Sequence, residues 1–140
     1  MNDIEVQVID KVIRAVKAEY PKAKVEDRFT ENPASFPYVC VYEVNSFMPQ
    51  RYQDNTRKEL YTEVAYEAQV FTNDTMKKST AKAIAEIVDT TMQDIGFLRT
   101  FKSQVPNIER TIYRIVLRYT AVVENATYGE TNNVINIYHR

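Results

Sequence analysis

Apolar residues in the first twenty positions recur at the spacing of one helix face, with charged residues between them. This pattern predicts an amphipathic helix that ends before Pro21, because proline disfavours helical geometry in the residue before it. Asn2 or Asp3 is placed to cap its start. β-Branched residues of modest helix propensity dominate the apolar face, so we expect the helix to depend on docking against a sheet. The apolar positions are Ile4, Val8, Ile9, Val12, Ile13, Val16 and Tyr20.

Five later segments have the alternation, or the β-branched and aromatic content, that is typical of strands. Cys40 falls in the most apolar of them and is expected in the core, where a free cysteine behaves as a small hydrophobe. A polar stretch over 45–58 separates the second strand from the third. The strands are expected at 25–29, 38–44, 59–71, 97–102 and 108–123.

A second helix is predicted over 75–95, with Gly96 as a left-handed C-cap. Lys77 and Lys78 fall in its first turn, where the helix dipole disfavours cations. These two side chains are either solvated or in contact with carboxylates of a partner. The expected buried stripe is Ala81, Ile84, Val88, Thr91, Met92 and Ile95.

The order of these elements predicts the α+β class, with a mostly antiparallel, mixed sheet packed against two main helices. No repeat or linker divides the chain, so we expect a single domain over 1–123 and a C-terminal arm over 124–140. Within the arm, 134–138 has the composition of a strand. It can complete its own sheet or add a strand to the exposed edge of a neighbour. Its candidate contact residues are Ile135, Ile137 and Tyr138.

The scarce residue types exclude most enzyme classes. Among its 140 residues the chain has two isolated glycines, one histidine and one cysteine. Two isolated glycines cannot form a glycine-rich dinucleotide turn or a P-loop. One histidine excludes a multi-His zinc site within one chain and argues against a Ser-His-Asp triad, and one cysteine permits no intrachain disulfide. We therefore expect no catalytic residues, no cofactor and no metal site.

Charge and hydropathy limit the expected partners. Acidic residues at 3, 5 and 10 interrupt the apolar pattern of the N-terminal segment, whereas a signal peptide needs an uninterrupted apolar core. No apolar run approaches the roughly 18 residues of a membrane span, so we expect a cytoplasmic protein without a membrane partner. The formal net charge of -1 argues against affinity for DNA, but not against a surface past which DNA moves as cargo.

The most informative candidate site is a pair of charged faces. Glu63 and Glu67 are four residues apart on one predicted strand, and Arg114 and Arg118 are four apart on another. If these strands are antiparallel neighbours, Glu63 can face Arg118 and Glu67 can face Arg114, each pair contributing roughly 0.2–1 kcal/mol. The pairs either fix the register of a solvated face or belong to a surface that meets a neighbouring subunit. A catalytic carboxylate pair is the least favoured interpretation, because no nearby base accompanies it.

The polar stretch over 45–58 supplies a second set of candidate contacts. Loops of this length inside compact domains are usually functional or mobile. Tyrosine is enriched at protein interfaces, because its ring packs while its hydroxyl keeps a hydrogen bond. The candidates are Arg51, Tyr52 and Arg57.

Six segments in this order carry a family resemblance over roughly 4–123. They are EYP at 19–21, NPASFPYV at 32–39, EVAYEAQVF at 63–71, AKAIA at 81–85, IGFLRT at 95–100 and YRIVLRY at 113–119. Together they resemble the small neck proteins of tailed bacteriophages and prophages, also labelled minor capsid or tail-completion proteins. The helix, sheet, helix and long-strand layout is most similar to that of tail terminators.

The resemblance implies a structural virion assembly protein without chemistry. It implies a ring, typically a homo-hexamer, that caps the tail tube and offers a surface to the head-tail connector or stopper protein. Its implied place is the virion neck, after assembly in the cytoplasm of the bacterial host. A head-side adaptor, a stopper or another neck component is the alternative within this class. The alternative from another class is a small ligand-binding protein or enzyme with a pocket between sheet and helices.

Overall fold

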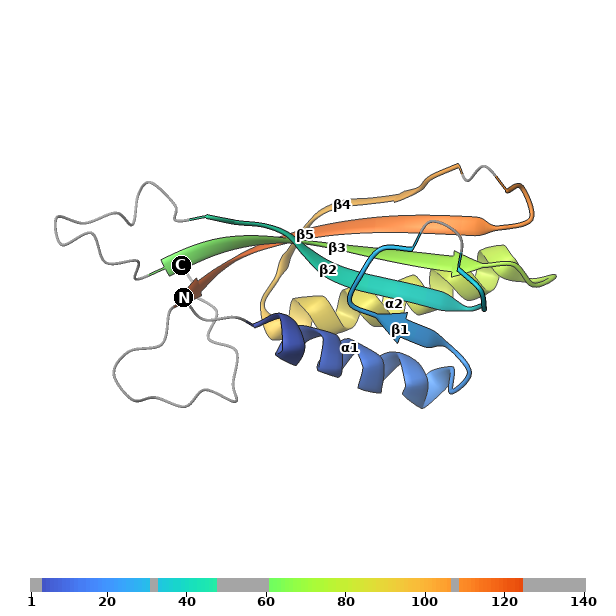
Figure 1. Ribbon diagram of the computed structural model, residues 1–140, viewed down its shortest axis with the longest axis horizontal. Coiled ribbons are helices and arrows are strands. Elements are labelled where there is room, and N and C mark those ends of the chain that lie inside the picture. Colours follow the sequence, from blue (N-terminus) through green and yellow to red (C-terminus); the bar gives the residue numbers. More distant parts are fainter. Residues whose placement is uncertain (1–3, 31–32, 48–60, 107–108, 125–140) are drawn as a thin grey trace, which may run out of the picture.

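The computed structural model describes residues 4–30, 33–47, 61–106 and 109–124, which form two helices and a five-stranded sheet (Figure 1). The strand order is β1-β2-β3-β5-β4; β1 and β2 are parallel, and the other neighbours are antiparallel. This architecture confirms the predicted α+β class. The elements are α1 (Glu5–Glu19), β1 (Lys24–Glu26), β2 (Tyr38–Phe47), β3 (Tyr61–Thr72), α2 (Lys77–Ile95), β4 (Leu98–Gln104) and β5 (Tyr113–Glu124).

Both helices cover one face of the sheet, and the main core fills the space between the two layers (Figure 1). Helix α1 contributes Val8, Val12 and Val16, all fully buried, as its period predicts. Burying one such side chain stabilises the fold by roughly 1.5–3 kcal/mol. The buried side of α2 matches the predicted stripe at four positions. It consists of Ala81, Ile84, Ala85, Val88, Asp89 and Met92, while Thr91 and Ile95 are half-buried.

A smaller cluster occupies the opposite face of the sheet, which we call the outer face. Tyr38, Cys40 and Phe71 are buried there, beneath the segment that connects β1 to β2. The Tyr38 hydroxyl donates a hydrogen bond to the carbonyl of Arg28 at 3.2 Å and accepts one from the Thr30 hydroxyl at 3.0 Å. Cys40 is therefore buried as expected, but in this cluster and not against the helices.

Several element boundaries differ from the sequence prediction. Helix α1 begins after Ile4, which makes no side-chain cap, and Asn2 and Asp3 lie outside the described residues. Strand β1 is shorter than predicted. Strand β2 continues to Phe47 and so includes the first three residues of the predicted loop; 48–58 lie outside the described residues. Gly96 ends α2 at a φ of 120°, as predicted for a glycine C-cap.

Candidate interaction surface

The two charged strands are antiparallel neighbours, which meets the condition stated for the charge pairs, but their register differs from the one that those pairs need. Glu67 lies opposite Arg118, whereas Glu63 lies opposite Val122 and Arg114 lies opposite Phe71. The expected Glu63–Arg118 and Glu67–Arg114 pairs are therefore wrong. The observed register is displaced by four residues from the expected one.

Burial explains this choice of register. A shift of four residues leaves every side chain on the same face, so alternation alone does not distinguish the two arrangements. The observed register places Ala121 and Val123 in the main core, opposite Val64 and Thr62 of β3. Burial of an apolar side chain outweighs the roughly 0.2–1 kcal/mol of one cross-strand ion pair.

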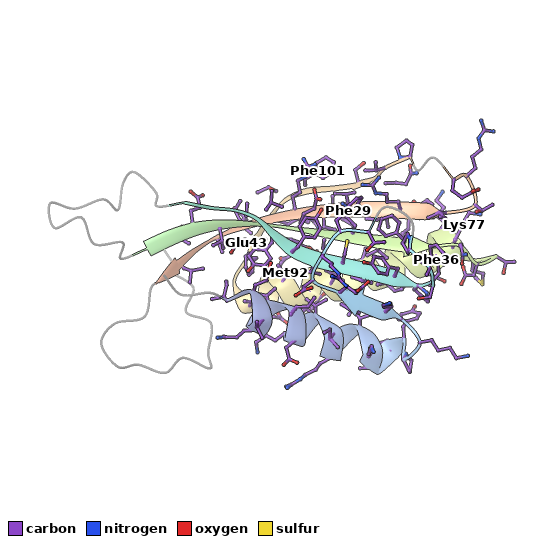
Figure 2. All side chains as sticks on the ribbon, viewed as in Figure 1. Phe29, Phe36, Glu43, Lys77, Met92 and Phe101 are labelled. Carbon is purple, nitrogen blue, oxygen red and sulfur yellow. The ribbon has the colours of Figure 1, made fainter. Side chains whose placement is uncertain are left out.

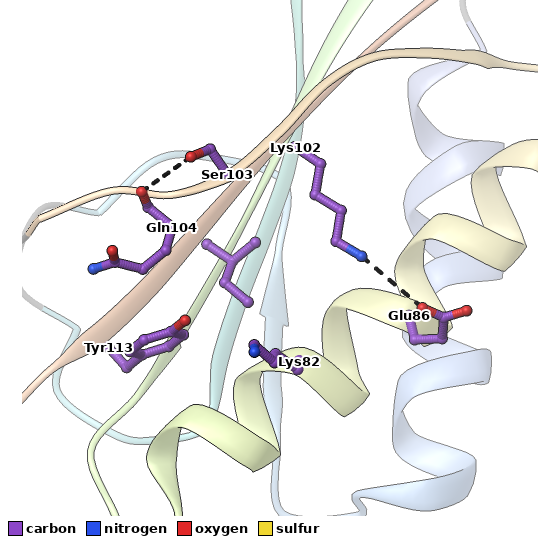
Figure 3. A pocket seen from close by; sticks show the side chains of 7 residues that line it. Lys82, Glu86, Lys102, Ser103, Gln104 and Tyr113 are labelled. Carbon is purple, nitrogen blue, oxygen red and sulfur yellow. Dashed lines mark hydrogen bonds and ion pairs between the residues drawn. The ribbon is translucent and has the colours of Figure 1, made fainter.

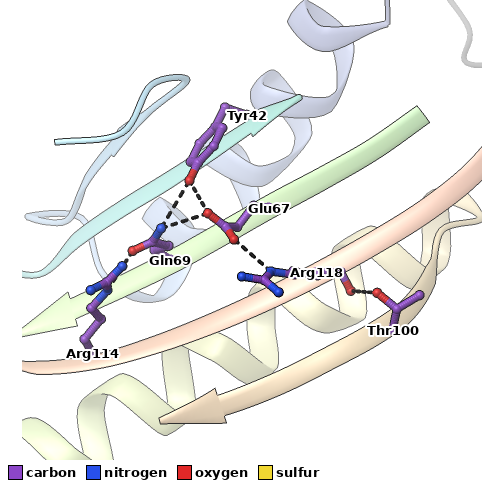
Figure 4. A network of polar contacts seen from close by, with 6 residues as sticks. All are labelled: Tyr42, Glu67, Gln69, Thr100, Arg114 and Arg118. Atoms are coloured by element: carbon purple, nitrogen blue, oxygen red, sulfur yellow. Dashed lines mark hydrogen bonds and ion pairs between the residues drawn. The ribbon is translucent and has the colours of Figure 1, made fainter. Parts of the chain in front are cut away.

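A polar network on the outer face joins β2, β3 and β5 (Figure 4). Glu67 is its centre. One carboxylate oxygen accepts a hydrogen bond from Nε of Arg118 at 3.0 Å. The other accepts from the Tyr42 hydroxyl and, at 2.9 Å, from Nε2 of Gln69. The Gln69 carbonyl oxygen accepts from Nε of Arg114 at 2.8 Å, so both predicted arginines belong to one network.

The surroundings keep Glu67 ionised. Burial raises the pKa of this carboxyl, but hydrogen bonds from Tyr42, Arg118 and Gln69 outweigh it, and the net effect lowers the pKa. The pKa of the Tyr42 hydroxyl is raised, first by burial and then by its hydrogen bond to the carboxylate. Glu67 therefore acts as an acceptor only, with Tyr42 as a neutral donor.

Aromatic rings flank both arginines of the network. The guanidinium carbon of Arg118 lies 5.0 Å from the ring centre of Phe101 on β4. That of Arg114 lies 5.6 Å from the ring of Phe71 and 5.9 Å from the ring of Phe29, which Figure 2 labels. These distances are within the range of cation–π attraction. The Arg118 side chain is still 58% exposed, so it can meet a partner without leaving its own contacts.

The remaining predicted site residues lie elsewhere. Glu63 is half-buried on β3, four residues before Glu67 on the same face and outside the network. Lys77 and Lys78 lie in the first turn of α2, as predicted, although the helix begins at Lys77 and not at 75; the Lys77 carbonyl accepts a hydrogen bond from the Thr72 hydroxyl at 2.6 Å. They belong to the helix layer and not to the outer face. Six candidates lie outside the described residues: Arg51, Tyr52, Arg57, Ile135, Ile137 and Tyr138.

Sequence analysis missed three members of this surface. Tyr42 is the register partner of Glu67, and Gln69 is one repeat along the same strand. Phe101 belongs to the edge strand β4. The alternation of β3 was a usable signal for Gln69, because it shares a face with Glu67. Tyr42 and Phe101 required knowledge of the strand order.

Two surface depressions are relevant to ligand binding. One, of about 420 Å³, lies on the outer face beside the network and is lined by Tyr42, Val44, Glu67 and Arg118, among others. A second, of about 510 Å³, lies between α2 and β4 (Figure 3), where Nζ of Lys102 is 3.9 Å from the Glu86 carboxylate. The described residues contain no group of three or more potential metal ligands. No helix in this part of the chain is long and apolar enough to cross a membrane.

Comparison with known proteins gives a likeness of fold. No protein-family model matches the chain, and no curated protein matches its sequence. Among solved structures, the chain is similar to a chain in the structure titled "Virion of native gene transfer agent (GTA) particle". The TM-score is 0.57 at 20% sequence identity, over 84% of this chain and 92% of the other. The shared fold therefore extends over most of both chains.

Proposed function

We propose that this chain is a structural protein of a tailed-phage virion or of a phage-like particle. The observation that carries the proposal is the fold shared with a chain of the gene transfer agent virion, over most of both chains. The segments quoted above point in the same direction, since they resemble phage neck proteins. A role in assembly needs surfaces that join proteins, and the outer face, where ionic, aromatic and apolar groups lie together, is suited to that.

Within that class, we favour a ring-forming tail terminator that caps the tail tube and contacts the head connector. A ring needs unlike patches that meet on successive copies. The charges of this sheet are segregated in that way: besides the internally bonded Glu67, the acidic residues Glu43 and Glu63 lie on β2 and β3, and basic residues dominate β4 and β5. Complementary charge mainly sets partner choice and orientation. The proposed partners are further copies of the chain, the tail tube protein and the connector. DNA passes the protein only as cargo.

Electron microscopy of the purified chain tests this function. The chain is mixed with tail tubes, and separately with head connectors, from the particle encoded beside its gene. We expect a ring at the end of each tube. Rings found only on connectors would support a head-side adaptor or stopper instead. Absence of binding to either, with a monomeric mass at high concentration, would refute the virion role.

A matched pair of variants locates the contact. Arg118→Glu removes an exposed cation of the outer face and places an acid beside Glu67. We expect it to weaken ring formation or tube binding by at least about tenfold, or about 1.4 kcal/mol. Lys11→Glu makes the same charge change at an exposed position of α1 and is the control. Equal loss in both variants would show that net charge, and not the outer face, controls binding.

A further inference from the structure

The sheet ends in two unlike edges that lack a neighbouring strand among the described residues. Strand β4 is the last strand on one side, and all seven of its residues are exposed. On the other side, β1 pairs with β2 only along 38–40, which leaves 41–47 of β2 without a strand beside it in the described part. The Glu43 amide donates a hydrogen bond to the Glu5 carboxylate at 3.0 Å. The Glu43 backbone amide therefore points away from β3, toward the open side.

Both edges expose apolar side chains on the outer face. Leu98 and Phe101 of β4 are 68% and 39% exposed, and Val44 of β2 is 60% exposed. The register places Phe101 opposite Arg118 and Leu98 opposite Thr120, and Val44 lines the outer-face depression with Tyr42. Exposed apolar edges are a risk for aggregation unless a partner covers them.

Charge differs between the edges on the helix side of the sheet. Lys102 of β4 lies opposite the core residue Leu117, and Glu43 of β2 lies opposite the core residue Tyr66, so both side chains lie on that face. Figure 2 labels Glu43 near the start of α1, where the Glu5 hydrogen bond places it. One edge is thus basic and the other acidic on the same face of the sheet.

We propose that β4 of one copy pairs with 41–47 of β2 in the next copy, so that the sheet continues across the subunit boundary. Lys102 then meets Glu43 on the helix side, while Leu98 and Phe101 meet Val44 on the outer face. The β2 edge gives up the hydrogen bond from Glu43 to Glu5 and gains a strand. This inference deepens the proposed function, because it takes the chain to assemble with itself.

Strand direction fits this contact. Strands β2 and β5 run one way and β3 and β4 the other. A copy rotated about an axis parallel to the strands keeps these directions, so its β4 meets β2 of the neighbour in antiparallel orientation. The contact joins unlike edges and is therefore heterologous. A row of paired copies has a free β4 edge at one end and a free β2 edge at the other. Such contacts produce a ring when the rotation closes.

Two variants that each block one edge test the pairing. The Val105 amide donates to the Arg114 carbonyl on β5, and successive backbone amides of a strand point to opposite sides. The Gln104 amide therefore points to the open edge of β4. Gln104→Pro therefore removes an outward donor and keeps the ladder to β5, whereas Ser103→Pro would break that ladder. Val44→Lys places a cation on the outer face of the β2 edge, where the pairing requires an apolar contact with Leu98 and Phe101. Leu98→Glu is a second β4 variant that leaves the backbone unchanged.

Sedimentation velocity measures assembly, and circular dichroism confirms folding. We expect each single-edge variant to be monomeric at concentrations where the unaltered chain forms rings, a weakening of at least about tenfold. An equimolar mixture of Gln104→Pro and Val44→Lys should give dimers that grow no further, since each dimer joins the one intact pair of edges. Lys102→Glu and Glu43→Lys should each weaken assembly, and both changes in one chain should restore it.

The outcomes separate this inference from the proposed function. Rings formed unchanged by a folded Gln104→Pro or Leu98→Glu variant would overturn the edge pairing, and binding of those rings to tail tubes would leave the virion role intact. Dimers formed by Val44→Lys alone would also overturn it, because they require a symmetric contact. Failure of the double charge exchange to restore assembly would refute the Lys102–Glu43 contact and the pairing built on it.

Discussion

Replacement of Asp89 is expected to cause a large loss of stability. This buried carboxylate of α2 ties the helix to β4 and β5. One oxygen accepts a hydrogen bond from the buried Tyr119 hydroxyl at 2.7 Å. The other accepts from Arg99 at the start of β4 and from Gln93 on the same helix, both at 2.8 Å. Three donors around one carboxylate leave little of its charge uncompensated.

The expected magnitude follows from these contacts. A hydrogen bond to a charged group contributes about 1.5–3 kcal/mol, and Asp89→Ala leaves the Tyr119 hydroxyl buried without this acceptor. The Arg99 contact contributes less, about 1 kcal/mol, because its side chain is 40% exposed and screened by water. We therefore expect Asp89→Ala to lower the free energy of unfolding by about 3–4 kcal/mol. Asp89→Asn keeps an acceptor for Tyr119 and should cost about 1–2 kcal/mol.

Urea denaturation followed by far-ultraviolet circular dichroism measures these differences, and the chain has no tryptophan for fluorescence. Asp94→Ala is the control, since it removes an exposed carboxylate from the last turn of the same helix and should change stability by less than about 0.5 kcal/mol. A double-mutant cycle with Tyr119→Phe should give a coupling of at least about 1 kcal/mol. An Asp89→Ala variant as stable as the control would refute the reasoning.

Two further predictions concern titrating side chains. Because the folded state lowers the pKa of Glu67, the stabilising effect of the Glu67 carboxylate is present above its ordinary pKa of 4.5 and is lost as the pH falls through the pKa of the folded state. Between about pH 5 and 3 the urea midpoint should therefore fall more steeply for the unaltered chain than for Glu67→Gln. Equal slopes in the two proteins would contradict this prediction. Burial raises the pKa of the Cys40 thiol to about 12, so a maleimide should label it only as fast as the chain unfolds, and urea should accelerate the reaction. Labelling in native buffer at the rate of a free thiol would show that Cys40 is accessible.

The helices and most strands were predictable, because the apolar residues that recur at the helix or strand period in the sequence are the ones buried in the structure. Val8, Val12 and Val16 are buried as their spacing indicates, and Gly96 ends α2 as its place indicates. The signal for Asp89 was also present, since it falls four residues after Ala85 on the buried side of α2. An acidic residue within an apolar stripe indicates a buried partner, although its identity requires the fold.

The register and the strand order were not predictable from local patterns. Side chains on one face of a strand repeat every two positions. A register shift of two or four residues therefore leaves every side chain on the same face, and the alternation of the sequence cannot distinguish such registers. Arg114 was therefore assigned to Glu67 but bonds Gln69, and Arg118 was assigned to Glu63 but bonds Glu67. The apolar surface buried along the whole pair of strands decides between such registers. A short sequence motif does not reveal that total.

The network changes which groups of the outer face a partner meets. Glu67 already accepts three hydrogen bonds, so it is not available to a neighbouring subunit, contrary to its sequence-based role as a contact residue. Arg118 is different, because only one side of its guanidinium is used by Glu67 and the side chain remains largely exposed beside Phe101. A partner on this face therefore meets the planar guanidinium of Arg118 beside Phe101, and the hydrogen bond to Glu67 holds that guanidinium in place. Because an arginine held in one conformation loses little entropy on binding, Glu67 would act at the proposed interface by positioning Arg118, without touching the partner.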